Sequence, residues 1–162
     1  MSVDDNLWFK TLWHSICVAK FFARSVEVSY DESFEYFRKI LDGVKNSGAY
    51  TYVIGNGGSC SIASHISEDI LNHCGIRSVA LSDGSLITCF ANDYGFENVY
   101  RKSLGTLLYD NNALVVVSTS SGNSPNLIKA VELAIARKIR VIALTSFSWE
   151  NRLNTPCQTQ RT

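Results

Sequence analysis

The sequence is poor in the features that mark several large classes of protein. Its 162 residues include two prolines and one methionine, and only 19% of them are charged. No internal repeat, low-complexity tract or proline-rich linker interrupts the chain. Because 46% of the residues are hydrophobic, the chain has enough apolar surface to form a core, which excludes a disordered tail or a disulfide-stapled mini-protein. We therefore expect a single domain over residues 1–162.

Neither sign of charge is in excess, since 15 basic residues balance 15 acidic ones. Overall charge therefore favours neither nucleic acid nor an anionic membrane as a partner, and any phosphate must be bound by local donors. The first ten residues contain Asp4 and Asp5 instead of a basic region followed by an apolar run, and no long uncharged stretch lacks polar residues. These features predict a soluble, cytoplasmic protein.

The cysteines form no C-x-x-C pair of the kind found in zinc ribbons and redox sites. The chain has an odd number of them, five, at widely scattered positions: Cys17, Cys60, Cys74, Cys89 and Cys157. We expect reduced thiols in a cytoplasm, each acting mainly as a small buried hydrophobe.

Residues 1–49 have the pattern of helices. Several apolar residues follow helical spacing, and further aromatic residues fall on other faces of the same segment: Trp8, Leu12, Ile16, Ala19 and Ala23, then Phe9, Trp13 and Phe22. Such a helix is either buried within its own monomer or associates with another subunit. The segment from Ser29 to Glu32 matches a capping box, which predicts a second amphipathic helix that ends at Gly48.

From Tyr50 onward, short apolar runs alternate with helical segments. The runs cover residues 52–54, 79–81, 114–117 and 141–144, and the helical segments cover residues 62–71, 86–90, 98–108 and 127–137. Uninterrupted apolar strands separated by helices predict a parallel sheet covered on both faces. The fold class is therefore α/β, a three-layer doubly wound sandwich with ligands at the carboxyl ends of its strands. Residues 50–145 form this core, and residues 146–162 form an irregular tail.

Two polar loops follow strands in this scheme. The first contains Asn56, Gly57, Gly58 and Ser59, whose backbone amides and helix start suit a polar or anionic ligand. A tight connector without a ligand is the alternative for this loop. It lacks both the G-x-G-x-x-G spacing of a dinucleotide site and the Gly-Lys-Ser/Thr of a P-loop, so no nucleotide is expected.

The second loop is rich in hydroxyl groups and precedes a helix that Pro125 is suited to begin. Its candidate ligand-binding residues are Thr119, Ser120, Ser121 and Ser124. Hydroxyl and amide donors at a helix start predict a neutral phosphate site, whereas a plain N-cap would need only one such residue.

His65 and Asp69 lie four positions apart on the helix expected after the first loop, so their side chains share one face, with Glu68 adjacent. Such a pair transfers protons or supplies two ligands of an incomplete metal site; the alternative is a surface ion pair. His14 and His73 have no comparable context. Residues 91–96 are expected to form a polar turn that either faces a ligand or caps the next helix.

Together these motifs resemble the sugar isomerase (SIS) domain, and within that superfamily the phosphoheptose isomerases. The resemblance spans about residues 50–145 and rests on the order and spacing of these motifs: Gly55 to Ser59 with His65, Ser82-Asp83, Asn92 to Phe96, and Ser120 to Ser124 with Lys129-Ala130. It implies a flavodoxin-like strand order. The aromatic N-terminal helices resemble the helical lead-in of that family, which packs in a homotetramer.

The resemblance implies an aldose–ketose isomerase that converts sedoheptulose 7-phosphate into D-glycero-D-manno-heptose 7-phosphate for lipopolysaccharide precursors. The hydroxyl-rich loop would hold the phosphate, and Asn56 to Gly58 with Asn92 and Asp93 would hold the sugar hydroxyls. His65 and Asp69 would be the catalytic residues and would also bind the zinc ion found in some family members.

The sequence departs from the family pattern in two places. Asp69 stands where the family has a Glu, so its side chain is one methylene shorter. In addition, no His follows His73, whereas the family has a C-terminal helix that carries a Gln and a His of the active site. Three alternatives follow: an isomerase with impaired chemistry, a non-catalytic sugar-phosphate-binding regulator similar to the replication-initiator-associated members, or a structural subunit of an oligomer.

Overall fold

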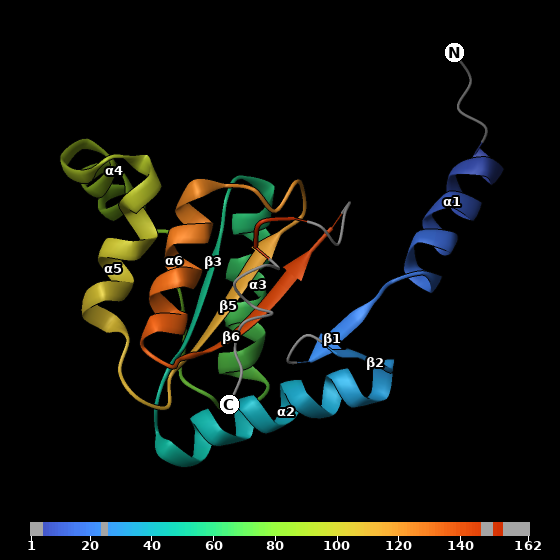
Figure 1. The fold of residues 1–162 in the computed structure, drawn as a ribbon, viewed down its shortest axis with the longest axis horizontal. Helices are drawn as coiled ribbons and strands as arrows, with labels where there is room; N and C mark the ends of the chain where they lie inside the picture. Colours follow the sequence, from blue (N-terminus) through green and yellow to red (C-terminus); the bar gives the residue numbers. More distant parts are fainter. Residues whose placement is uncertain (1–4, 24–25, 147–150, 154–162) are drawn as a thin grey trace.

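The computed structural model describes residues 5–23, 26–146 and 151–153 (Figure 1). In chain order the elements are α1 (Asp5–Cys17), β1 (Phe21–Ala23), β2 (Val26–Val28), α2 (Tyr30–Ser47), β3 (Thr51–Gly55), α3 (Gly58–Asn72), β4 (Ser78–Ala80), α4 (Gly84–Tyr94), the 3-10 helix η1 (Phe96–Asn98), α5 (Val99–Leu107), β5 (Ala113–Ser118), α6 (Pro125–Ala136) and β6 (Arg140–Thr145). Strands β3 to β6 form a parallel sheet in the order β4-β3-β5-β6. The predicted α/β class, the four strands and the flavodoxin-like order are therefore confirmed.

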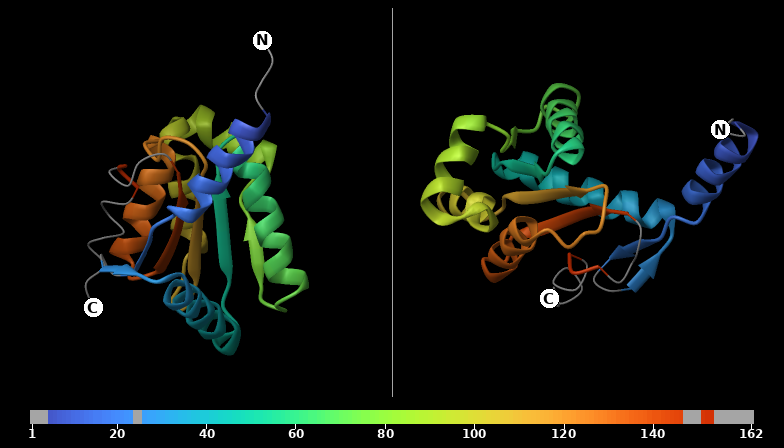
Figure 2. Two further views of the ribbon diagram at one scale, coloured as in Figure 1. Left: turned by 90° about the vertical axis from the view of Figure 1, so that its right-hand side faces the viewer. Right: turned by 90° about the horizontal axis from the view of Figure 1, so that it is seen from above.

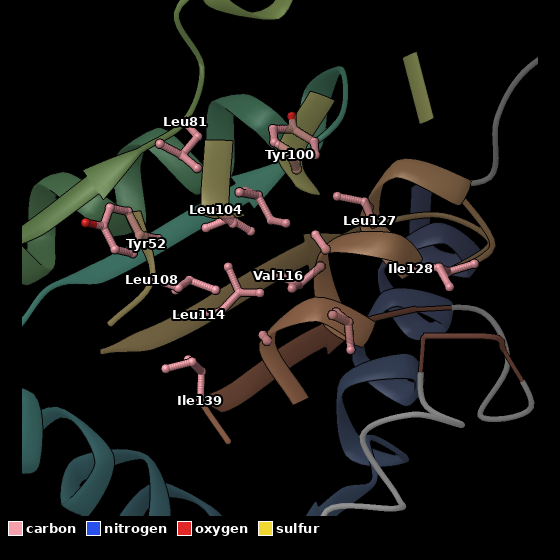
Figure 3. Packing of buried hydrophobic residues seen from close by; sticks show 14 of the residues in the cluster. Tyr52, Leu81, Tyr100, Leu104, Leu108, Leu114, Val116, Leu127, Ile128 and Ile139 are labelled. Carbon is pink, nitrogen blue, oxygen red and sulfur yellow. The ribbon is translucent and has the colours of Figure 1, made fainter. Parts of the chain in front are cut away.

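The two central strands explain why their sequences are continuously apolar. Every residue of β3 and β5 is buried, and alternate side chains point to opposite faces of the sheet. Leu114 and Val116 pack with α5 and α6 on one face, in the cluster drawn in Figure 3. Val115 and Val117 pack with Ala63 of α3 on the other face. The sheet is thus covered by helices on both sides, as a doubly wound fold requires.

Helix α2 begins and ends where its sequence predicts. Ser29 is the N-cap, with a reciprocal capping box to Glu32, and Gly48 ends the helix in the left-handed conformation at φ 65°. Leu41 and Val44 on the inner face of α2 pack against Ile70 and Ile76. Local capping signals therefore set both ends of this helix. Packing against Ile70, Ile76 and Ala113, the first residue of β5, sets its position near the amino ends of the strands.

The prediction of helix throughout residues 1–49 is wrong between α1 and α2. Phe21–Ala23 pairs with Val26–Val28 as a two-stranded antiparallel ribbon. Its aromatic and β-branched residues prefer extended backbone, and the pairing of the two segments satisfies that preference better than one long helix does.

Helix α1 projects away from the α/β core (Figures 1 and 2). Its large apolar side chains are exposed, with Trp8 at 54%, Phe9 at 64% and Trp13 at 68%. Of the two alternatives for this helix, burial within its own monomer is therefore wrong for the described part of the chain.

Four of the cysteines lie in the described residues, and each carries a free thiol. Cys60 is half-buried, but Cys17, Cys74 and Cys89 are exposed, so the expectation of buried thiols is wrong for these three. These three thiols lie on α1, after α3 and on α4, at positions that face solvent. Cys157 lies outside the described residues, as do residues 147–150 and 154–162 of the predicted tail.

Among the described residues, no helix combines the length and apolar character needed to cross a membrane.

Candidate functional site

The two predicted loops lie side by side because their strands do. β3 and β5 are parallel neighbours, so the loop after β3 and the loop after β5 both leave the carboxyl edge of the sheet. These loops lead to α3 and α6, which cover opposite faces of the sheet. The strand order therefore reverses between β3 and β5, and such a switch point is where doubly wound folds bind ligands.

Hydrogen bonds join the glycine loop (residues 56–59) to the hydroxyl loop (residues 119–124) and to the first turn of α6. Ser59 Oγ lies 2.8 Å from Thr119 Oγ1 and accepts a hydrogen bond from the Thr119 backbone N–H at 3.0 Å. Asn56 and Asn126 exchange two amide hydrogen bonds, at 2.9 and 2.8 Å. These bonds hold the two loops together as one unit, because one loop cannot move relative to the other without breaking them.

Asn126 is a site residue that sequence reasoning missed. It is 1% exposed and lies in the first turn of α6, where its Oδ1 also accepts from the Leu127 backbone N–H at 3.0 Å. A polar amide beside the apolar residues Leu127 and Ile128 in the first turn of α6, directly after the hydroxyl loop, was the available signal. The sequence could not show that its partner would be Asn56, which is 70 residues away.

The hydroxyl loop is only partly engaged with itself. Ser120 and Ser121 are exposed, and Ser121 Oγ accepts a hydrogen bond from the Asn123 backbone N–H at 3.3 Å. Ser124 is the N-cap of α6, but its side chain makes no capping hydrogen bond. The alternative that these hydroxyls are present only to cap the helix is therefore not supported, and they remain accessible to a ligand at the positive end of α6.

At the end of β3, Gly55 allows a close approach of backbone to backbone. A Cβ at this position would lie 2.6 Å from the Ser59 carbonyl oxygen. The hydroxyl of Tyr100, on α5, donates to the Gly55 carbonyl oxygen. Burial raises the pKa of Tyr100 to about 12, with a smaller contribution from Cys60.

Tyr100→Phe is expected to flatten the alkaline limb of the stability curve. Since the pKa of Tyr100 rises from 10.0 to about 12 on folding, the folded state holds the proton more tightly. The resulting stabilisation is complete below pH 10 and is lost between about pH 10 and 12, at about 1.4 kcal/mol per pH unit. Urea unfolding at several pH values measures this loss in wild type and in the variant. Tyr109→Phe, which alters a 72% exposed ring, is the control and should keep the wild-type curve. Equal alkaline slopes in wild type and Tyr100→Phe would show that Tyr100 is not responsible.

On α3, the prediction that His65 and Asp69 share a face is confirmed. His65 Nε2 lies 3.8 Å from Asp69 Oδ2, and His65 Nδ1 lies 3.2 Å from Glu68 Oε2. The structure adds His73, whose Nδ1 lies 3.2 Å from Asp69 Oδ1. The same four-residue spacing could have identified this second pair, so the view that His73 lacks context is wrong. All four side chains are about half exposed or more.

The described residues around His65 and Asp69 do not complete a zinc site. Within residues 5–23, 26–146 and 151–153, no three His, Cys, Asp or Glu side chains come together in a way that could hold a metal ion. His65 and Asp69 offer two ligands, whereas zinc sites in proteins use three or four.

Asn92 and Asp93 lie in the last turn of α4, not in a polar turn as predicted. Asp83 caps the start of the helix by accepting from the Leu86 backbone N–H at 2.8 Å. The helix continues to Tyr94 and ends at Gly95, which has a positive φ of 83° that favours glycine and whose backbone N–H donates to the Ala91 carbonyl oxygen. Asp93 accepts hydrogen bonds from Asn92 at 3.0 Å and from Cys89 at 3.6 Å, so these contacts stay within α4. Asp93 raises the pKa of the Cys89 thiol, which keeps it protonated.

A family profile described as the SIS domain matches residues 24–146 of this chain, which is well over half of its length. The chain belongs to the SIS domain family. In sequence, this SIS domain is 35% identical over 136 residues to a phosphoheptose isomerase of Shewanella denitrificans, a match that covers 76% of this chain and 69% of that protein. It is also 35% identical to the phosphoheptose isomerase of Sodalis glossinidius over 119 residues, covering 70% of this chain and 61% of that enzyme.

The structural comparison agrees with the sequence comparison. The fold of this SIS domain is similar to that of a phosphoheptose isomerase from Francisella tularensis, with a TM-score of 0.80 and 28% sequence identity. That match covers 96% of this chain and 80% of the Francisella chain. The chain is therefore related to phosphoheptose isomerase, and it spans between about six tenths and eight tenths of these three proteins.

Proposed function

We propose that this SIS domain binds a sugar phosphate of the heptose 7-phosphate class at the joined loops. The phosphate contacts hydroxyls and backbone amides of the hydroxyl loop, at Thr119, Ser120, Ser121 and Ser124. The sugar hydroxyls contact residues 56–59 together with Asn92 and Asp93. The observation that carries the proposal is the hydroxyl loop itself, because the Ser124 hydroxyl stays free of its capping bond at the start of α6.

The reaction that this site would perform is an aldose–ketose isomerisation, which interconverts sedoheptulose 7-phosphate and D-glycero-D-manno-heptose 7-phosphate through an enediol. In it, a proton leaves one of two adjacent carbons and returns to the other, while their oxygens exchange a proton. Asp69 is the proposed base that carries the carbon-bound proton, and His65 serves the oxygens. The proposed setting is the cytoplasm, where the product feeds lipopolysaccharide precursors.

A non-catalytic sugar-phosphate-binding regulator is the second candidate. It is favoured by the exposure of both catalytic candidates, since the side chain of His65 is 73% exposed and that of Asp69 49%. Proton transfer from carbon is fastest in a site that excludes water, whereas binding at the loops does not require it. The two candidates share the ligand and differ in turnover.

The binding proposal is tested by calorimetry with sedoheptulose 7-phosphate. Replacing Ser121 and Ser124 together by alanine removes two hydroxyl donors, so the affinity is expected to fall by about tenfold or more. Ser85→Ala, at an exposed serine of α4, is the matched control. Equal affinities in wild type and the double variant would refute the phosphate assignment.

We also propose that the chain forms a homo-oligomer, a tetramer in the phosphoheptose isomerase pattern. The support is α1, whose exposed Trp8, Phe9 and Trp13 leave a large apolar surface without a partner in the described part of the monomer. Light scattering at micromolar concentration is expected to give a multiple of the 18.0 kDa chain mass. Trp13→Glu should shift the mass toward the monomer, and a wild-type monomer would contradict the proposal.

A further inference from the structure

A short segment far along the chain packs against the hydroxyl loop. We call Asn151–Leu153 the strap; it follows the sheet and is drawn in red in Figures 1 and 2. The Leu153 side chain is fully buried in the cluster that also contains Leu127 and Ile128 of α6. Asn151 is 2% exposed. It packs closely against Gly122, since a Cβ added to Gly122 would lie 2.5 Å from the Cγ of Asn151. Both outer residues of the strap are therefore anchored in the protein.

The strap is also bonded to the hydroxyl loop through its backbone. The Leu153 N–H donates to the Gly122 carbonyl oxygen at 3.0 Å, and the Arg152 N–H donates to Asn123 Oδ1 at 3.0 Å. Asn151 Oδ1 accepts from the Leu153 N–H at 3.1 Å. These bonds fix the backbone of Arg152 beside the loop that holds the candidate phosphate-binding hydroxyls.

Arg152 is the exposed residue between two buried ones. Because Asn151 and Leu153 occupy the protein interior, the guanidinium of Arg152 stays at the surface next to the loop. An arginine side chain spans roughly the length of two residues of extended chain, which is enough to reach a ligand bound at Ser120 or Ser121.

Neither loop supplies a cation of its own. Residues 55–64 and 118–128 contain no lysine or arginine. Lys129, one turn into α6, is committed elsewhere, since its Nζ donates to Asn98 Oδ1 at 3.2 Å and lies 3.5 Å from Glu97 Oε1. A phosphate at this loop would therefore carry about two negative charges with no partner of opposite charge on either loop.

We propose that Arg152 is a phosphate-binding residue of this site, and that the strap exists to hold it there. This inference rests on the proposed function. The planar guanidinium offers paired N–H donors that match two oxygens of a phosphate group, and the fixed backbone reduces the entropy lost when the side chain is ordered. The strap thus adds to the hydroxyl loop the charge that the loop lacks.

The test is calorimetry with sedoheptulose 7-phosphate on wild type, Arg152→Gln and Arg152→Lys. We expect Arg152→Gln to weaken binding by about tenfold. The affinity of Arg152→Lys should lie between those of wild type and Arg152→Gln, because lysine keeps the positive charge but lacks the paired N–H donors of the guanidinium. The affinity of wild type should also fall more steeply with added salt than that of Arg152→Gln. Arg101→Gln, at an exposed arginine of α5, is the matched control and should bind as wild type does.

The substitutions should not disturb the fold, because the bond from the strap to Asn123 uses the backbone N–H of residue 152. Equal thermal unfolding midpoints in wild type and Arg152→Gln would verify this. If Arg152→Gln binds as tightly as wild type while the Ser121 and Ser124 double variant does not, the role of Arg152 is overturned and the proposed function stands. If wild type itself binds no sugar phosphate, both are overturned.

Discussion

Asp69→Asn is expected to lower the rate of heptose phosphate isomerisation by about 10² to 10⁴-fold, while the affinity for sedoheptulose 7-phosphate changes by only a few-fold. The substitution keeps the size and polarity of the side chain and removes the group that accepts a proton at neutral pH. Asp69 lies on α3 between His65 and the C-cap residue His73, so the amide can occupy the same place beside both rings. The loss should therefore appear in kcat and not in binding.

Glu68→Gln is the comparison that makes this result specific. Glu68 is the neighbouring carboxylate on α3, and it contacts the other ring nitrogen of His65. Its side chain leaves the helix at a different angle from that of Asp69, so we expect a change of only a few-fold. NMR of the sugar phosphate measures both rates directly. A larger loss in Glu68→Gln than in Asp69→Asn would transfer the role of base to Glu68.

The same assay separates the two candidate functions. If the wild-type protein binds the sugar phosphate but does not convert it, the regulator is the correct function and Asp69 is not a catalytic base. Because the Asp69 side chain is one methylene shorter than that of a glutamate, Asp69→Glu should then bring a carboxylate closer to the loops. A gain of turnover in Asp69→Glu would point to reach as the missing factor.

Gly55→Ala is expected to have the largest effect on stability, lowering the free energy of unfolding by about 3 kcal/mol. The added Cβ would lie 2.6 Å from the carbonyl oxygen and 2.8 Å from the carbonyl carbon of Ser59, and these are backbone atoms that cannot rotate away. The start of α3 must therefore move from the end of β3. That movement breaks the contacts of Ser59 with Thr119, so the affinity for sugar phosphate should fall as well.

Gly58→Ala is the control for this variant, since a Cβ on Gly58 meets no atom within 4 Å. Gly58 is the first residue of α3, where alanine is at least as favourable as glycine. Its free energy of unfolding should stay within about 0.5 kcal/mol of wild type. Urea denaturation measures both variants. A Gly55→Ala protein as stable as Gly58→Ala would show that the end of β3 can relax without cost.

Local patterns in the sequence were sufficient to predict the sheet and the two loops. The apolar runs that became β3 and β5, the capping box at Ser29 and the end of α2 at Gly48 all depend on residues within a few positions of one another. Strand order also followed, through the resemblance to the SIS domain, and it places the two loops side by side. The relation between His65 and Asp69 needed only the helical repeat.

The tertiary structure alone decided how the loops are held. The pairing of Asn56 with Asn126 joins residues 70 positions apart, and the bond from Tyr100 to Gly55 joins residues 45 apart. The strap reaches the hydroxyl loop across 29 residues, from Arg152 to Asn123. No periodicity or local motif encodes such partners, because they form only after the sheet has brought the segments together and buried polar groups must find hydrogen bonds there. The ribbon of β1 and β2 has the same origin, since pairing between these two strands, and not the helical spacing of their apolar residues, determined their conformation.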